Sequence, residues 1–435
     1  MMKRLLPLLS VLSLLLATGV VAQTPPPDEV IIRVGKPGEH ATPLALPMPK
    51  GGAAQSDELW AVIKRDLELS GYFRIIPAEA TTEPAGAGLR PGEFSFSDWR
   101  TVGAAILAKT GAQLTGSSLR TEVWVYDVAG TAELGAKAYT GTTASVRSMG
   151  HRIANEIMYL VTKKHGFFDT RISFAGKFGP NKEIYVMDID GYGRRAITKN
   201  GSINLKPRWN PSGNALSFTS YLAGNPDLYV ADLSKGQIRR VSARAGLNTG
   251  GAFSPDGSRL VVTLTTSGDP ELYLIDAASG NQIAQLTKTP GIDVSASWSP
   301  DGSQLAFVSD RGGSPQIYIM SSGGGEARRI SFGGNQCTDP SWSPKGNKIA
   351  YVARDGNFDV FTVGLDGKGL TRITQGQGDN EDPSWSPDGD YLAFSSTRTG
   401  AGHIWIASDD GYHQIQITTG GGGYSNPSWS PHLDW

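Results

Sequence analysis

Serine and histidine are the first residue types to examine, because a serine nucleophile activated by a histidine base is a recurrent hydrolase design. The sequence contains no G-x-S-x-G nucleophile motif, and the nearest segment, Gly312 to Gln316, lacks the final glycine. The six histidines are scattered, without an H-E-x-x-H motif or the paired Cys/His spacing of zinc sites. They are interpreted as surface or core residues. No catalytic residue, metal ligand or cofactor is predicted.

Aspartates in recurring P-D-G turns could indicate carboxylate catalysis or calcium binding. They are Asp256, Asp301 and Asp388, but the same position of other turns holds Ser212 and Lys345. A position that accepts Asp, Ser and Lys serves turn geometry rather than chemistry. The sequence also contains no EF-hand loop.

Aromatic residues and one cysteine complete the set of candidate chemical groups. One aromatic precedes each turn, and packing between repeats explains this without a ligand cage: Trp209, Phe253, Trp298, Trp342, Trp385 and Trp429. Cys337 is the only cysteine, so it cannot form an internal disulfide, and it is expected to be a small core or loop residue.

These residues belong to a W-S-P-x-G phrase that repeats six times and therefore indicates an architecture. Its proline recurs every 43 to 45 residues, at Pro211, Pro255, Pro300, Pro344, Pro387 and Pro431. A period near 40–45 with several short strands per unit is typical of a β-propeller blade of four strands, A to D. The segment from Arg171 to Thr198 supplies strands B, C and D without an A, and the chain ends on an A without a B. The sequence therefore predicts a six-bladed propeller, residues 166–435, closed by the C-terminal strand joining blade 1.

The region before the repeat is expected to be a separate small α/β domain, residues 23–165. Helices are predicted at Ser56 to Ser70, capped by Ser56 and stopped by Gly71, and at Ser145 to Lys164. The Pro-rich segment from Lys36 to Gly52 is expected to be extended or mobile. A positive start, an apolar stretch and a small-residue end predict a cleaved secretory signal at residues 1–22.

Composition excludes several classes of protein. The 40 Lys and Arg residues nearly balance the 41 Asp and Glu residues, which argues against a nucleic-acid-binding surface. Glycine is abundant, at 55 residues, and has no collagen period. The chain is expected to be a folded, turn-rich β protein.

The loops that vary between repeats are the candidate functional surface, because a rigid frame commonly carries function on its loops. D-to-A and B-to-C loops lie on one face of a propeller. They place Arg311, Arg354 and Arg398 at comparable positions, expected beside Asp339, Glu381 and Asp382. Solvated local salt bridges and a polar docking ring around the channel mouth are both open interpretations.

Three segments carry a resemblance to a known family: FSDWRTVGA (96–104), YTGTTASVRSMGHRIANEI (139–157) and FFDTRISF (167–174). Together with the six repeats and the secretory start, they closely resemble the TolB family of the Tol–Pal system. The resemblance covers essentially the whole chain after the signal, although the 104–125 region is only loosely similar.

The resemblance implies a non-enzymatic periplasmic adaptor that maintains outer-membrane integrity and its invagination during cell division. It implies that the propeller mouth binds the lipoprotein Pal and that an N-terminal tail, residues 23–35, binds TolA. It places Leu247, Gly250 and Val294 in the loops that contact Pal. Together with the loop residues described above, the predicted mouth contacts are Leu247, Asn248, Gly250, Val294, Ser295, Asp339, Glu381, Asp382, Arg311, Arg354 and Arg398. The implied tail contacts are Glu29, Val30, Ile31, Ile32, Arg33 and Val34, which read as a strand that could add to a partner sheet.

An alternative function remains open from the residues alone. An exported propeller could act as a peptidase-like enzyme or a carbohydrate-binding lectin that uses the channel. A nucleophile and base converging in the channel, or a ligand on the strand-A aromatics, would favour it.

Overall fold

A computed structural model describes residues 36–80, 83–84 and 86–433. The predicted signal segment and the predicted tail, with its strand at Glu29 to Val34, lie outside the described residues. In the described range, no helix is both long and apolar enough to cross a lipid bilayer.

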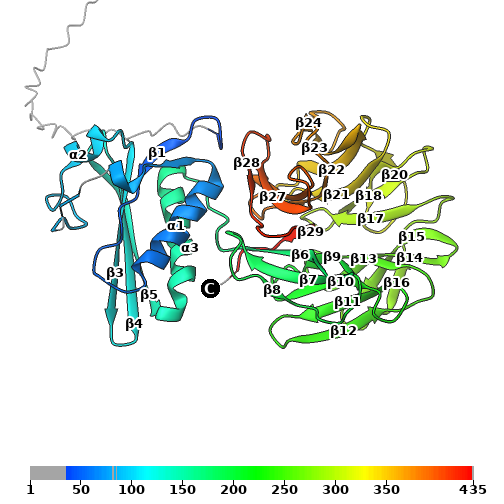
Figure 1. Cartoon of the computed structure of the whole chain (residues 1–435). Helices are drawn as coiled ribbons and strands as arrows, with labels where there is room; N and C mark the ends of the chain where they lie inside the picture. The colour runs from blue at the N-terminus through cyan, green and yellow to red at the C-terminus, as the bar shows by residue number, and fades with distance from the viewer. Residues whose placement is uncertain (1–35, 81–82, 85, 434–435) are drawn as a thin grey trace, which may run out of the picture. The chain divides into compact units, whose positions relative to one another are not determined.

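The N-terminal part of the described chain is a five-stranded sheet with two long helices. Strand β1 pairs in parallel with β2 and β3, while β3, β4 and β5 are antiparallel, in the order β2-β1-β3-β4-β5. Helices α1 and α3 pack against each other, and α3 contacts β4 and β5 (Figure 1). The elements are β1 (Thr42–Ala45), α1 (Ser56–Ser70), β2 (Phe73–Ile75), the 3-10 turn Ala78–Ala80, α2 (Phe96–Thr101), β3 (Ile106–Thr115), β4 (Ser118–Asp127), β5 (Ala132–Thr142), the 3-10 turn Thr143–Ser145 and α3 (Val146–Thr162).

The two long helices form where hydrophobic periodicity predicts them, and their apolar faces are buried. Leu59, Val62 and Ile63 of α1 are buried, as is Ile153 of α3. Gly71 ends α1 with φ of 69°, a left-handed conformation that glycine adopts at little cost. The buried apolar faces hold α1 and α3 against each other and against the sheet.

One of two local expectations needs correction. Ser56 is not the cap of α1; the cap position is Gln55, which makes no side-chain capping bond. Ser56 is already helical, and its hydroxyl is buried, so it cannot turn back toward the first helical amides. The Pro-rich segment from Lys36 to Gly52, expected to be extended or mobile, contains the extended strand β1, which lies between two other strands.

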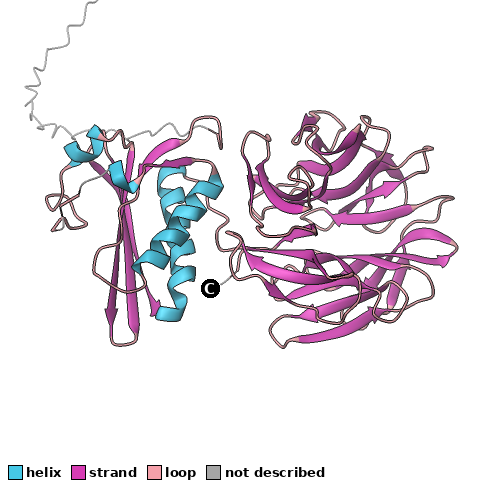
Figure 2. Cartoon of the chain, viewed as in Figure 1, coloured by secondary structure: helices cyan, strands magenta, loops and turns pink. Residues whose placement is uncertain are grey.

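The rest of the described chain forms six four-stranded antiparallel sheets, the blades of a propeller (Figure 1). Figure 2 shows strands and loops but no helices in this part of the described chain, and in sequence order all described helices come before β6. Blades 1 to 3 contain β6 (Arg171–Phe178), β7 (Asn181–Asp188), β8 (Arg195–Ala196), β9 (Asn204–Trp209), β10 (Ala215–Ser220), β11 (Asp227–Asp232), β12 (Gln237–Ser242), β13 (Asn248–Phe253), β14 (Arg259–Ser267), β15 (Asp269–Asp276) and β16 (Gln282–Gln285). Blades 4 to 6 and the closing strand contain β17 (Asp293–Trp298), β18 (Gln304–Ser309), β19 (Gln316–Ser321), β20 (Ala327–Arg329), β21 (Cys337–Trp342), β22 (Lys348–Asp355), β23 (Asn357–Gly364), β24 (Thr371–Arg372), β25 (Asn380–Trp385), β26 (Tyr391–Ser396), β27 (His403–Ser408), β28 (Gln414–Gln416) and β29 (Tyr424–Trp429).

The predicted closure of the ring is confirmed. Blade 1 has the strand order β29-β6-β7-β8, so the last strand of the chain completes the first blade. Trp429 pairs with Ile172, and Ser428 pairs with Ser173. In blade 1, β29 pairs with β6, so the backbone edge of β6 that would otherwise be exposed is covered.

The strand-A tryptophans pack between blades, as the sequence predicts. The indole N–H of Trp298 donates to the carbonyl of Ala252 in the preceding blade, at 3.0 Å. Trp385 donates in the same way to Ser341, also at 3.0 Å. Trp209, Trp298 and Trp385 make this interblade hydrogen bond, which favours tryptophan over phenylalanine at these three positions.

The turn aspartates hold the hairpin geometry that was predicted for them. Asp256 accepts hydrogen bonds from the hydroxyl of Ser254 and the amide of Ser258, the latter at 3.0 Å. These hydrogen bonds lower the pKa of Asp256 to about 2. Asp301 repeats the arrangement one blade later.

Blade 6 is joined to the end of α1 by hydrogen bonds. The hydroxyl of Tyr391 donates to the carbonyl of Ser70 at 2.7 Å, and Nε2 of His413 lies 3.0 Å from the carbonyl of Leu69. Both bonds satisfy carbonyls that the last turn of a helix leaves without an intrahelical donor. Blade 6 therefore acts as a cap for α1.

Candidate functional site

The six inner strands share an unusual backbone feature near the mouth of the channel, the end to which the D-to-A and B-to-C loops belong. The third residue of each strand A has positive φ: Lys206 (51°), Gly250 (94°), Ser295 (55°), Asp339 (49°), Asp382 (57°) and Asn426 (53°). We call these six residues the mouth ring. The register against strand B shifts next to each of them, as a β-bulge does.

The backbone of the mouth ring carries strain. A left-handed conformation costs a residue with a Cβ roughly 1–2 kcal/mol. Five of the six members are not glycine, and strain of this kind is concentrated at binding and catalytic sites. The repeated bulge therefore marks the mouth as a candidate functional surface.

One ion pair spans the channel within the mouth ring. Nζ of Lys206 in blade 2 lies 2.6 Å from Oδ1 of Asp339 in blade 5, the blade directly opposite. The charge of Asp339 raises the pKa of Lys206. Burial alone would raise the pKa of Asp339, but the ammonium of Lys206 outweighs burial and lowers it. Both groups are therefore charged at neutral pH.

A second link joins neighbouring blades of the mouth ring. Oδ2 of Asp382 accepts hydrogen bonds from the backbone amide of Asn426 at 3.1 Å and from its side-chain amide at 2.8 Å. Burial, and then the nearby charge of Asp339, raise the pKa of Asp382. The preceding residue, Glu381, remains exposed. The mouth therefore has charged groups that bond to one another, with the exposed residue Glu381 beside them.

Two of the three predicted arginines, Arg311 and Arg398, pair within their own blades and not with the predicted acids. Arg311 pairs with Asp293 at 2.9 Å, and Arg398 donates to Oδ1 of Asn380 at 2.9 Å. Each partner is the first residue of strand A in the same blade, where it is buried and accepts the arginine of its own B-to-C loop. In blade 5 that position is Cys337, which offers no carboxylate, and Arg354 is exposed.

The remaining predicted contacts differ in accessibility. Leu247 and Val294 are half-buried, and Val294 packs against the apolar core of blades 4 and 5. Asn248 is fully buried, and its side chain bonds the hydroxyl of Ser242 and the amide and carbonyl of Arg244. Asn248 therefore shapes the loop and presents no side chain at the surface.

Sequence reasoning missed other residues of the mouth. Lys206 and Asn426 occupy the same strand position as Asp339 and Asp382, three residues before the tryptophan. Aligning the repeats on that tryptophan would have identified them. The exposed apolar residues Tyr221 and Leu222 were also missed, because hydropathy alone does not separate exposed from buried apolar side chains.

The other end of the channel holds a cavity of about 300 Å³. Arg208 lines it together with the strand-A aromatics and serines such as Ser341 and Ser384. None of the residues that line it in the described chain is an Asp, Glu, His or Cys, so no base or metal ligand faces these serines. The cavity offers serine hydroxyls, aromatic faces and Arg208.

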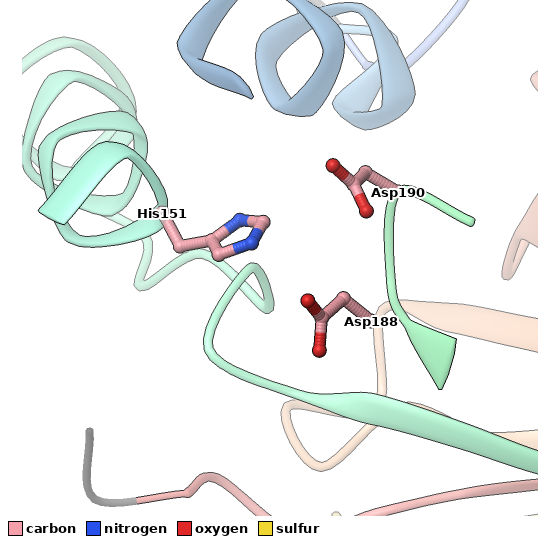
Figure 3. A group of neighbouring side chains, drawn as sticks. All are labelled: His151, Asp188 and Asp190. Atoms are coloured by element: carbon pink, nitrogen blue, oxygen red, sulfur yellow. The ribbon is translucent and has the colours of Figure 1, made fainter. Parts of the chain in front are cut away.

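A cluster of titratable side chains lies where α3 meets blade 1. Figure 3 shows the ring of His151 facing the carboxylates of Asp188 and Asp190, and one ligand atom from each lies within 4.8 Å of the others. The spacing would suit a metal ion, but Arg147 pairs with Asp190 and lies 3.8 Å from Asp188. Arg171 also pairs with Asp188, at 3.0 Å. These arginines already neutralise the carboxylates, so the cluster is best described as an ion-pair junction.

His151 also pairs with Asp66 of α1, with Nδ1 2.6 Å from Oδ2. Both side chains are buried. Burial alone would lower the pKa of His151, but the charge and hydrogen bond of Asp66 raise it. Burial raises the pKa of Asp66 to about 6. The pair therefore keeps its proton to a higher pH than an isolated histidine.

Comparison with known proteins finds relatives for both parts of the chain. Residues 159–433 match the family described as TolB beta propeller domain, and residues 30–134 match TolB amino-terminal domain. The Tol-Pal system protein TolB of Geobacter sulfurreducens is 39% identical over 210 residues, 46% of this chain and 48% of the relative. That of a Ruegeria species is 34% identical over 210 residues, 47% of each chain. The chain thus aligns with about half the length of these curated relatives.

A solved structure covers more of the chain. The crystal structure of TolB from Acinetobacter baumannii superposes with a TM-score of 0.82 at 26% sequence identity. The superposition covers 92% of this chain and 99% of that chain. The similarity therefore includes the α/β part as well as the propeller.

Proposed function

The chain belongs to the TolB family and is thus a component of the Tol–Pal system, and we propose that it is a non-enzymatic periplasmic adaptor. It binds the lipoprotein Pal through the propeller mouth and TolA through the N-terminal tail. In this role it helps to maintain outer-membrane integrity and the invagination of the outer membrane during cell division.

The mouth ring is the observation that carries this proposal. Six bulges at one strand position, five of them on residues other than glycine, form a preorganised surface, and a preorganised surface loses little conformational entropy when a partner binds. Leu247, Val294 and Glu381 are the accessible candidates for contact with Pal around it. The envelope partner is therefore expected to dock onto a surface that is already formed.

The cavity at the far end of the channel bears on the peptidase-like alternative. It is lined by serine hydroxyls without an acid or base among the described lining residues. A serine nucleophile needs such a base for activation. The peptidase-like alternative therefore has no positive observation in its favour.

Calorimetry with the full chain after removal of residues 1–22 tests the two partners separately. The periplasmic domain of Pal is expected to bind the intact protein and a variant that lacks residues 23–35. TolA is expected to bind the intact protein only. Retention of TolA binding without residues 23–35 would overturn the proposed role of the tail, and failure of Pal to bind the intact protein would overturn the proposed role of the mouth.

A further inference from the structure

An exposed apolar cluster lies on the mouth face of blade 2. Ile203, Tyr221 and Leu222 are 42%, 38% and 52% exposed. The amide of Tyr221 donates to the carbonyl of Ile203 at 3.0 Å, so the D-to-A loop before β9 and the B-to-C loop of the same blade meet here. We call these three residues the apolar shelf. Contiguous exposed apolar residues on a folded protein commonly mark an interaction surface.

The loop that carries the apolar shelf is held in place by its own hydrogen bonds. The amide of Gly224 donates to the carbonyl of Tyr221 at 2.9 Å, and the amide of Leu222 donates to the hydroxyl of Ser220 at 3.2 Å. Ser220 is fully buried. The apolar side chains are therefore exposed by a fixed turn, and ordering them on binding requires little further loss of freedom.

The apolar shelf is continuous with the mouth contacts of blade 3. The side-chain amide of Asn225 donates to the carbonyl of Gly246 at 2.8 Å, and Leu247 follows directly. The loop that carries Tyr221 and Leu222 is therefore bonded to the loop that carries Leu247, and one partner could cover both loops. This continuity indicates which occupant the shelf would take.

We propose that the apolar shelf is the apolar anchor of the partner-binding face, and that the lipoprotein domain bound at the mouth presents an apolar cluster to Ile203, Tyr221 and Leu222. This inference rests on the proposed function. Buried aromatic and aliphatic anchors dominate the affinity of many interfaces, whereas charged rim residues contribute mainly to the association rate and the salt dependence. Affinity should therefore depend on the shelf, and its salt dependence should not.

The test is calorimetry of the periplasmic domain of Pal against the full chain and a Tyr221→Ser/Leu222→Ser variant, at low and high salt. The variant is expected to bind at least about tenfold more weakly, with the same salt dependence as the unchanged protein. The matched control is Ile238→Ser, because Ile238 is 45% exposed in the outermost strand of the same blade. It is expected to leave the affinity within about twofold.

The outcomes separate the inference from the function on which it rests. If the unchanged protein binds Pal and the Tyr221→Ser/Leu222→Ser variant binds equally well, the inference is overturned and the proposed function stands. If the variant and the Ile238→Ser control weaken binding equally, the effect is not specific to the shelf and the inference also fails. If the unchanged protein does not bind Pal, the proposed function and the inference both fail. Melting temperatures of all three proteins show that each is folded.

Discussion

Nζ of Lys206 lies 2.6 Å from Oδ1 of Asp339 on the opposite side of the propeller channel. Asp339 is 15% exposed at its side chain, and Lys206 is 37% exposed. The pair therefore joins blades 2 and 5 directly, in addition to the contacts that each blade makes with its neighbours. It also gives the channel mouth a charged floor rather than an open passage.

Lys206→Met is expected to destabilise the protein. The substitution leaves the carboxylate of Asp339 largely buried without its cation, which costs several kcal/mol for a fully buried pair. Because Lys206 is partly exposed, about 1–3 kcal/mol is expected, measured as the free energy of unfolding in urea. The double variant Lys206→Met/Asp339→Asn removes both charges and should recover most of that loss. A double variant as unstable as Lys206→Met would contradict this electrostatic explanation.

The contribution of the His151–Asp66 pair to stability is expected to fall as pH rises above about 4, because the folded protein holds protons at this pair to a higher pH than the unfolded chain does. The raised pKa of His151 contributes stability that is complete below the unfolded pKa, near 6.5, and is lost as pH rises through the folded pKa. The pKa of Asp66 is raised to about 6, so this residue adds a loss of stability between about pH 4 and pH 6. Urea unfolding between pH 5 and 9 measures this dependence.

The control for this pH effect removes both titrating groups. A His151→Gln/Asp66→Asn variant should show a flatter dependence of unfolding free energy on pH than the unchanged protein. His432, a half-exposed histidine whose pKa is raised by its hydrogen bond to Asp169, offers a matched His432→Gln variant that keeps the buried pair. If the double variant and His432→Gln flatten the pH profile of the unfolding free energy equally, the buried pair is not the main source of the pH dependence.

Trp429→Phe is expected to cost more stability than Trp342→Phe. The indole N–H of Trp429 donates to Oγ1 of Thr170 at 2.8 Å, in the closing blade. That of Trp342 is buried without a hydrogen-bond partner among the described residues. Both substitutions keep an aromatic ring, so the difference, about 1 kcal/mol in the free energy of unfolding, isolates one hydrogen bond. Equal losses would show that this bond does not stabilise closure.

Gly71→Ala is expected to weaken the contact between α1 and blade 6. Gly71 has positive φ, and an added Cβ would lie 2.6 Å from Cγ of His413. The control is Gly103→Ala, which has a similar φ but no atom within 4 Å of the added Cβ. Gly103→Ala should cost about 1 kcal/mol for the backbone alone, and Gly71→Ala should cost more. Similar costs would show that His413 moves away freely.

The propeller was predictable because its sequence repeats. The phrase that contains Trp385 and Gly389 recurs at one spacing, which fixes the number of blades. The first blade lacks an A strand and the last A strand lacks a B strand, which identifies the closing strand. The helix around Ile153 was predictable from its 3.6-residue period. Repetition and periodicity are local signals that one sequence contains.

The mouth was only partly predictable because its contacts join distant blades. Nothing near Asp339 in the sequence indicates that Lys206, 133 residues earlier, reaches it across the channel. Likewise, Arg311 pairs inside its own blade because Asp293 is buried directly beneath it. The cap of α1 at Gln55 was also missed, because Ser56 is a stronger capping residue than the one used.

The most direct test of the mouth as the Pal-binding face is the dissociation constant of Pal from a mouth variant and a matched rim variant, measured by calorimetry. The mouth variant is Leu247→Ser/Glu381→Lys. The rim variant, Ile283→Ser/Glu326→Lys, makes the same changes at exposed positions in or beside outer strands. The mouth variant should bind Pal at least about tenfold more weakly, with the rim variant unchanged. Equal affinity of both variants and the unchanged protein would contradict the proposal that Pal docks at the mouth.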